Sequence, residues 1–63
     1  MTVELETRSS LAFEVSLLWE PAANELWVDV LHPASGERFE IPTTPDRAQD
    51  AFWHPFAYAL RAA

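Results

Sequence analysis

Residues 13–41 read FEVSLLWEPAANELWVDVLHPASGERFEI, and this stretch decides the fold. It contains two similar turn sequences, PAAN at residues 21–24 and PASG at residues 33–36. In each turn, Pro presets the backbone of the first position, and Asn or Gly tolerates the left-handed conformation at the last. Apolar and polar residues alternate on both sides of the turns, which is the period of a half-buried strand. The stretch therefore predicts three consecutive antiparallel strands joined by two four-residue loops.

These loops also predict the register of the strands. The first loop pairs Val15 with Val30, and the second pairs Val30 with Phe39 and Val28 with Ile41. All of these side chains then share one face of the sheet. A slip of one residue would turn the apolar side chains of one strand to the opposite face. Because turns and alternation agree, we expect an antiparallel meander with one apolar face.

A further strand is predicted at the N-terminus, where Val3 and Leu5 alternate with glutamates. The polar residues 8–10 are interpreted as the loop that follows it. A loop of this length places Leu5 opposite Phe13 and Val3 opposite Val15. We therefore expect the apolar face to continue across four strands.

The C-terminal segment changes to helical periodicity. Thr44 is a candidate N-cap, Pro45 suits the first helical position, and Asp46 suits the positive end of a helix. The apolar residues at helical spacing are Ala48, Phe52, Phe56, Ala59 and Leu60. We expect both phenylalanines in the core. We expect one amphipathic helix across the apolar face of the sheet. Because Pro55 lacks a backbone donor, it predicts a kink or short break at His54-Pro55, and not two separate helices.

The chain of 63 residues is expected to form a single domain, residues 1–63, of the α+β class. Its expected architecture is a four-stranded antiparallel β-meander with one C-terminal α-helix, kinked near Pro55, packed on one face. A domain of this size buries only about 60% of the surface that its unfolded chain exposes. The chain has no Cys, so disulfides cannot add stability. We therefore expect a homodimer, in which self-association supplements a small core.

The chain is acidic, with a net charge of −6 and no Lys. Because it lacks a basic stripe, we expect no direct nucleic-acid binding and no binding to anionic membranes. A basic protein partner is favoured electrostatically. The N-terminus carries Glu4 and Glu6 and has no long apolar run. We therefore expect no signal peptide and a cytoplasmic location.

The predicted register also describes the sheet face that points away from the helix. Leu18 and Trp27 lie side by side there, and a large indole on an exposed face is typical of an interface. Single exposed apolar residues are otherwise common on protein surfaces. The interface candidates are Leu18, Trp27, Leu31 and, on the flank of the helix, Trp53. The candidates for an acidic face are Glu4, Glu6, Glu14, Asp29 and Glu40.

Asp50, His54 and Tyr58 follow one another at helical spacing and are the ligand-site candidates. In one interpretation, Asp50 orients His54 as an acid–base or ligand-binding group. In the other, which we favour, they form a solvated helix face, because no nucleophile or oxyanion donor accompanies them. His32 and His54 lack the spacing of metal ligands, so we expect no metal site and no cofactor.

The end of the chain resembles a family of short, uncharacterised proteins from high-GC bacteria. The resemblance lies in Ser35-Gly36-Glu37, in Phe39 and in AFWHPFAYA at residues 51–59. It covers roughly residues 26–59. It implies a bacterial cytoplasmic protein, and it implies no activity, cofactor, partner or functional residue.

Taken together, these features favour a small non-enzymatic protein-interaction module that presents an acidic and aromatic sheet face to itself or to another protein. One alternative is an acidic inhibitor or antitoxin-like protein that blocks a basic surface. The other is a small ligand-binding protein or enzyme that uses the region around His54.

Overall fold

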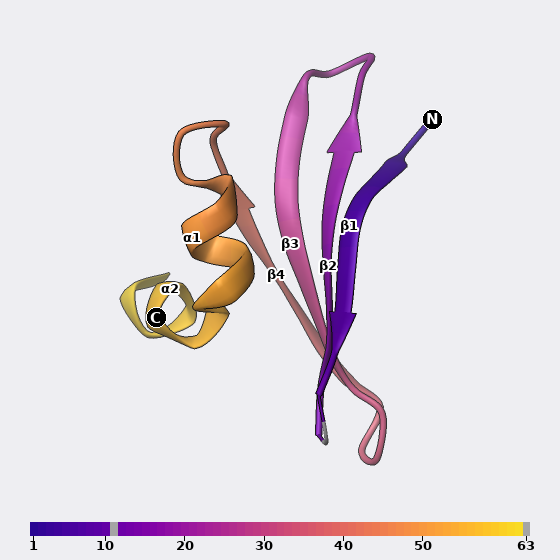
Figure 1. The fold of residues 1–63 in the computed structure, drawn as a ribbon, viewed down its shortest axis with the longest axis vertical. Helices are drawn as coiled ribbons and strands as arrows, with labels where there is room; N and C mark the ends of the chain where they lie inside the picture. The colour runs from indigo at the N-terminus through magenta and orange to yellow at the C-terminus, as the bar shows by residue number, and fades with distance from the viewer. Residues whose placement is uncertain (11, 63) are drawn as a thin grey trace.

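The computed structural model describes the backbone of residues 1–10 and 12–62 and the side chains of residues 1–10 and 12–58. It is a twisted antiparallel sheet in the order β1-β2-β3-β4, with two short helical segments packed on one face (Figure 1). The elements are β1 (Val3–Ser9), β2 (Glu14–Glu20), β3 (Glu25–His32), β4 (Glu37–Thr43), α1 (Ala48–Trp53) and α2 (Pro55–Ala62). The predicted α+β meander is therefore confirmed.

Both central hairpins have the predicted register. Val15 pairs with Val30, and Val30 pairs with Phe39. The last loop residues, Asn24 and Gly36, have φ angles of 51° and 76°. Both residues therefore have the left-handed conformation that the predicted turns require, and Asn and Gly tolerate this conformation well.

The conformation of Gly36 leads to a prediction about stability. A methyl group on Gly36 would meet no atom within 4 Å, so a substitution there is strained only through its φ angle. We expect Gly36→Ala to lower the free energy of unfolding by about 1 kcal/mol. Gly36→Asn should retain most of the parent stability, because Asn tolerates the left-handed region. Urea unfolding compares the variants, and an equal loss in both would contradict a backbone cause.

The predicted register of β1 is wrong. Val3 pairs with Trp19, not with Val15, and the register shifts between Glu4 and Glu6. This irregularity inserts an extra residue and reverses the side-chain alternation of the rest of the strand. As a result β1 continues through the segment that had been interpreted as a loop, and Arg8 pairs with Val15 on the face that carries the helices.

The start of the helix is also later than predicted. Thr44 does not cap it, because residues 45–47 form a turn in which the Arg47 amide donates to the Thr44 carbonyl at 3.0 Å. The Thr44 hydroxyl donates to the Asp46 carboxylate at 2.6 Å instead, which lowers the pKa of that carboxyl group. The first helical residue is Ala48.

The predicted break at His54-Pro55 is present, and it divides the segment into two helices. His54 has φ −132° and ψ 54°, outside helical geometry. A residue before Pro is disfavoured in the helical region, and Pro55 itself suits the first position of α2. We expected one kinked helix, and this expectation is wrong because α1 and α2 are separate helices.

The core lies between the sheet and α1. Its buried residues are Val15, Leu17, Val28, Val30, Ile41, Ala48, Ala51 and Phe52. Phe56 was expected in the core but is 46% exposed, because the break at His54 changes the direction of the chain. The helices pack over β2, β3 and β4, which leaves Val3 and Leu5 on β1 exposed.

Candidate interaction surface

The outer face of the sheet, opposite the helices, carries the predicted row of apolar residues. Leu18 pairs with Trp27, and Trp27 pairs with Pro42, so the three cross β2, β3 and β4 side by side. Leu18 and Trp27 are half-buried and Pro42 is exposed. Leu31 lies further along β3, between Glu14 and Arg38. Two of the sheet candidates, Leu18 and Trp27, therefore form one patch, and Leu31 lies apart from it.

The same face carries most of the negative charge. Its acidic residues are Glu4, Glu14, Glu20, Glu25, Asp29 and Glu40. The corrected register of β1 places Glu4 opposite Leu18, so a carboxylate stands at the β1 end of the apolar row.

Glu6 was predicted on this acidic face, and that prediction is wrong. It pairs with Leu17, whose side chain is in the core, and its carboxylate accepts a hydrogen bond from Gln49 Nε2 of α1 at 3.0 Å. The register shift after Glu4 turns Glu6 to the helix side. Glu20 and Glu25, next to the first turn, take part in the acidic face instead.

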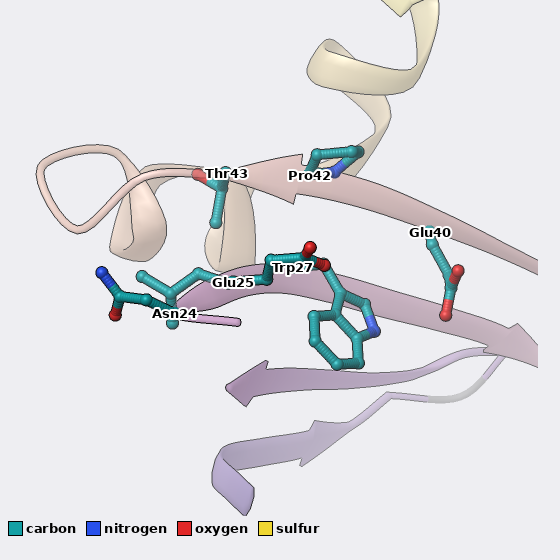
Figure 2. A pocket seen from close by; sticks show the side chains of 7 residues that line it. Asn24, Glu25, Trp27, Glu40, Pro42 and Thr43 are labelled. Atoms are coloured by element: carbon teal, nitrogen blue, oxygen red, sulfur yellow. The ribbon is translucent and has the colours of Figure 1, made fainter. Parts of the chain in front are cut away.

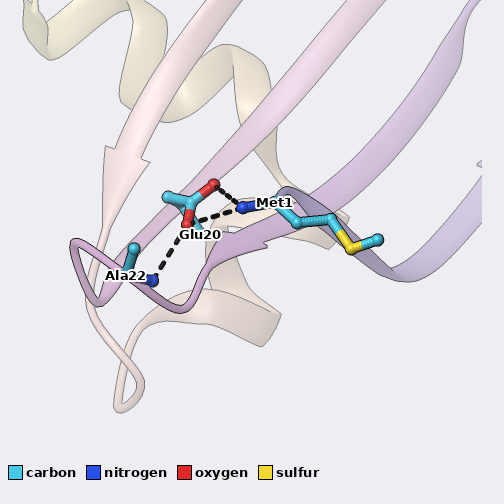
Figure 3. A network of polar contacts seen from close by, with 3 residues as sticks. All are labelled: Met1, Glu20 and Ala22. Atoms are coloured by element: carbon cyan, nitrogen blue, oxygen red, sulfur yellow. Dashed lines mark hydrogen bonds and ion pairs between the residues drawn. The ribbon is translucent and has the colours of Figure 1, made fainter.

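Two of these carboxylates have cationic partners. Arg38 Nε lies 3.2 Å from Asp29 Oδ1, an ion pair without hydrogen-bond geometry. The N-terminal amine of Met1 lies 2.9 Å from Glu20 Oε2, and the Ala22 amide donates to Glu20 Oε1 at 2.9 Å (Figure 3). These contacts, the amine first, lower the pKa of Glu20. Their stabilising effect is present above the usual pKa and is lost as the pH falls through the lowered one.

A groove of about 410 Å³ opens beside Trp27, where β3 begins and β4 ends (Figure 2). Its lining residues are Asn24, Glu25, Leu26, Trp27, Glu40, Pro42 and Thr43. Among the described residues, Glu25 and Glu40 form no ion pair. Trp27 Nε1 and Thr43 Oγ1 are buried, and neither atom has a hydrogen-bond partner among the residues that the structure describes. The groove thus combines an indole with two carboxylates that have no cationic partner among the described residues.

The three ligand-site candidates do not form the expected stripe. The Tyr58 hydroxyl donates to Asp50 Oδ2 at 2.5 Å, which joins α2 to α1. The His54 amide donates to the Asp50 carbonyl at 2.8 Å, but among the described residues no hydrogen bond joins the two side chains. His54 is exposed and borders a second cavity of about 300 Å³. Asp50 therefore does not orient His54 as an acid–base group.

Arg8 borders that second cavity and was not recognised from the sequence. Its Nε and Nη2 donate to the Phe52 carbonyl at 3.2 and 2.9 Å, and Nη2 also donates to the Trp53 carbonyl at 3.4 Å. Its guanidinium carbon lies 5.4 Å from the centre of the Phe52 ring and 5.0 Å from that of Trp53. Arg8 therefore binds the C-terminal end of α1 to the sheet.

Trp53 is 56% exposed and belongs to α1. Because α1 packs on the face opposite Trp27, the two tryptophans cannot share one contact patch. Trp53 remains an exposed aromatic residue on the helix side.

The two histidines lie in different parts of the fold, His32 at the end of β3 and His54 between α1 and α2. His32 pairs with Glu37, and its Nδ1 lies 2.7 Å from Ser35 Oγ. Within the part of the chain that the structure describes, no group of three or more His, Cys, Asp or Glu residues could hold a metal ion. None of its helices has both the length and the apolar character needed to cross a bilayer.

Comparison with known proteins assigns no family to the chain. A scan against models of protein families, a search of curated proteins and a search of solved structures each found no match. The resemblance to short proteins of high-GC bacteria therefore stays a prediction, and the function has to be inferred from the residues and geometry of the chain itself.

Proposed function

We propose that the chain is a non-enzymatic protein-interaction module whose contact surface is the outer face of the sheet around Trp27. The observation that carries the proposal is the position of Trp27, in a row with Leu18 and Pro42 and opposite the face that packs the core. Stability of the core does not require an indole on that face. Tryptophan is enriched among residues that dominate binding energies, because its large apolar surface can anchor a partner.

The charges on this face favour a foreign basic partner over a second copy of the chain. Glu4 stands beside Leu18, and Asp29 and Glu40 form the next row. Two copies stacked in register would bring these carboxylates together at both rows, which is unfavourable. A homodimer through this face would have to be offset from full overlap. An inhibitor that covers a basic surface of another protein would use the same residues.

The proposal predicts the effect of replacing Trp27. Trp27→Thr should weaken association about tenfold or more, with either a second copy or a partner, because it removes the anchor of the patch. The fold should persist, since Thr suits a strand and Trp27 does not contribute to the core cluster. Sedimentation velocity at micromolar concentration measures self-association. Retention of lysate proteins on the immobilised chain, identified by mass spectrometry, measures foreign partners.

Trp53→Gln is the matched control, because it removes an exposed indole from the opposite side of the domain. It should leave both measurements unchanged. A parent chain that sediments as a monomer would exclude the homodimer. If Trp27→Thr retains every protein that the parent and the control retain, and self-associates as they do, the outer face is not the contact surface.

A further inference from the structure

We propose that the groove beside Trp27 binds an arginine side chain of a partner protein, with the guanidinium stacked on the indole and paired with Glu25 and Glu40. This inference rests on the function proposed above and specifies its partner. It goes further in naming the chemical group that is recognised and the residues that recognise it.

The groove carries negative charge with no cation to balance it among its described lining residues. Glu25 and Glu40 line it, and none of its described lining residues is Lys or Arg. Neither carboxylate has a cationic partner within the described chain. An apolar guest would displace water from these carboxylates without replacing its hydrogen bonds, which is unfavourable. A cationic guest replaces them and is attracted by the chain's net charge of −6.

The groove also contains an indole. Trp27 is the aromatic side chain of the groove, and Pro42 lies opposite it on β4. Figure 2 shows Glu40 reaching from β4 toward the strand that carries Trp27. A cation over an indole face is attracted by the ring, and Trp is the best of the aromatic residues in this role. An aromatic face with carboxylates beside it is therefore a complete site for a cation.

The shape of the guest selects arginine over lysine. A guanidinium is planar, so it can stack on the indole while its edge donates two hydrogen bonds to one carboxylate. A lysine ammonium is compact and strongly hydrated, and it loses more water on entering such a groove. With a volume of about 410 Å³, the groove has room for a side chain of this size. A partner segment that presents an arginine to the outer face satisfies all of these features.

The test uses two capped peptides of the same length and shape that differ in the charge of the central side chain. One is acetyl-Gly-Val-Arg-Val-Gly-amide, and the other has citrulline, the neutral isostere of arginine, in its place. The indole N–H signals of the chain's three Trp residues are followed by 15N NMR during titration of each peptide. The arginine peptide should shift the Trp27 signal, weaken in binding as salt is added, and bind at least about threefold more tightly than the citrulline peptide.

Glu40→Gln and Glu14→Gln form the matched pair of variants. Both remove one charge from the outer face, but only Glu40 lines the groove. Glu40→Gln should weaken binding of the arginine peptide by about threefold or more, and Glu14→Gln by less than about twofold. Equal shifts of the Trp27 signal with both peptides, no shift with either, or equal affinity of the two variants would each overturn the arginine site.

These outcomes are separable from the proposed function. If Trp27→Thr abolishes association with partners while the two peptides behave alike, the outer face is the contact surface and the arginine site is wrong. If the arginine peptide shifts Trp27 and Trp27→Thr leaves all association unchanged, the groove binds arginine without serving the proposed function.

Discussion

Replacing Phe52 by alanine is expected to lower the free energy of unfolding by about 3–5 kcal/mol. Phe52 is 1% exposed and belongs to the cluster that joins α1 to the sheet. Truncation leaves a cavity between the two layers, because a small sheet and a short helix cannot both move to fill it. For a small domain that loss approaches the whole stability, so Phe52→Ala should be largely unfolded.

Phe56→Ala is the matched control for this prediction. Phe56 is 46% exposed, and its ring lies 4.9 Å from that of Phe13 and 5.8 Å from that of Phe39. Loss of such surface ring contacts should cost only about 1 kcal/mol. Thermal unfolding followed by circular dichroism compares both variants with the parent. A Phe52→Ala protein that melts within a few degrees of the parent would contradict the packing of α1 on this face.

Phe52→Leu keeps the comparison measurable if the alanine variant does not fold. Leucine fills part of the same volume and should cost clearly less than alanine. The order of stability should be parent, Phe56→Ala, Phe52→Leu and Phe52→Ala. A reversal of Phe56→Ala and Phe52→Ala would place the core under α2 instead of α1.

The contrast between these two phenylalanines shows where sequence periodicity stops being informative. Phe52 and Phe56 have the spacing of neighbours on one helical face, and that spacing continues through Pro55. The geometry at His54 interrupts the helix, so the second ring is carried out of the core. Pro55 predicted the break itself. The sequence contained no signal for the direction in which the chain continues after it.

The central hairpins were predictable because two independent signals coincide. Turn chemistry at Asn24 and Gly36 and the alternation of apolar residues specify the same register. For β1 the alternation of Val3 and Leu5 was present, but the shift after Glu4 is not marked by Gly or Pro. A bulge in such a segment depends on distant contacts, and those are not visible in the local pattern.

The candidate surface was predictable to the same extent as the register. The row of Leu18 and Trp27 and the row of Asp29 and Glu40 follow directly from the two central hairpins. The error at Glu6 follows from the error in β1. The groove depends on how neighbouring strands twist and on the sizes of facing side chains, and alternation does not encode either of them.

Substituting Arg8 by methionine is the second change with a large expected effect. We expect it to lower the free energy of unfolding by about 1.5–3 kcal/mol, the range for hydrogen bonds to a charged group. Arg8 donates to the Phe52 carbonyl through Nε and Nη2, across 44 residues of sequence. Its loss leaves the last carbonyls of α1 without these donors and removes the positive charge that favours the end of a helix.

Arg8→Lys and Arg47→Met separate the causes of that loss. Lysine keeps the charge but lacks the planar fork that reaches one carbonyl through two nitrogens, so its stability should be intermediate. Arg47 is exposed and lies at the start of α1, where a positive charge is not favoured, so Arg47→Met should change stability by less than about 0.5 kcal/mol. Urea unfolding measures all three variants.

Hydrogen exchange then shows where Arg8 acts. If Arg8 holds α1 against the sheet, Arg8→Met should speed exchange of the His54 amide, which donates to the Asp50 carbonyl at 2.8 Å, more than exchange in β3. A uniform change would indicate general destabilisation instead. An Arg8→Met protein as stable as Arg47→Met would show that the guanidinium contributes nothing to the packing of α1.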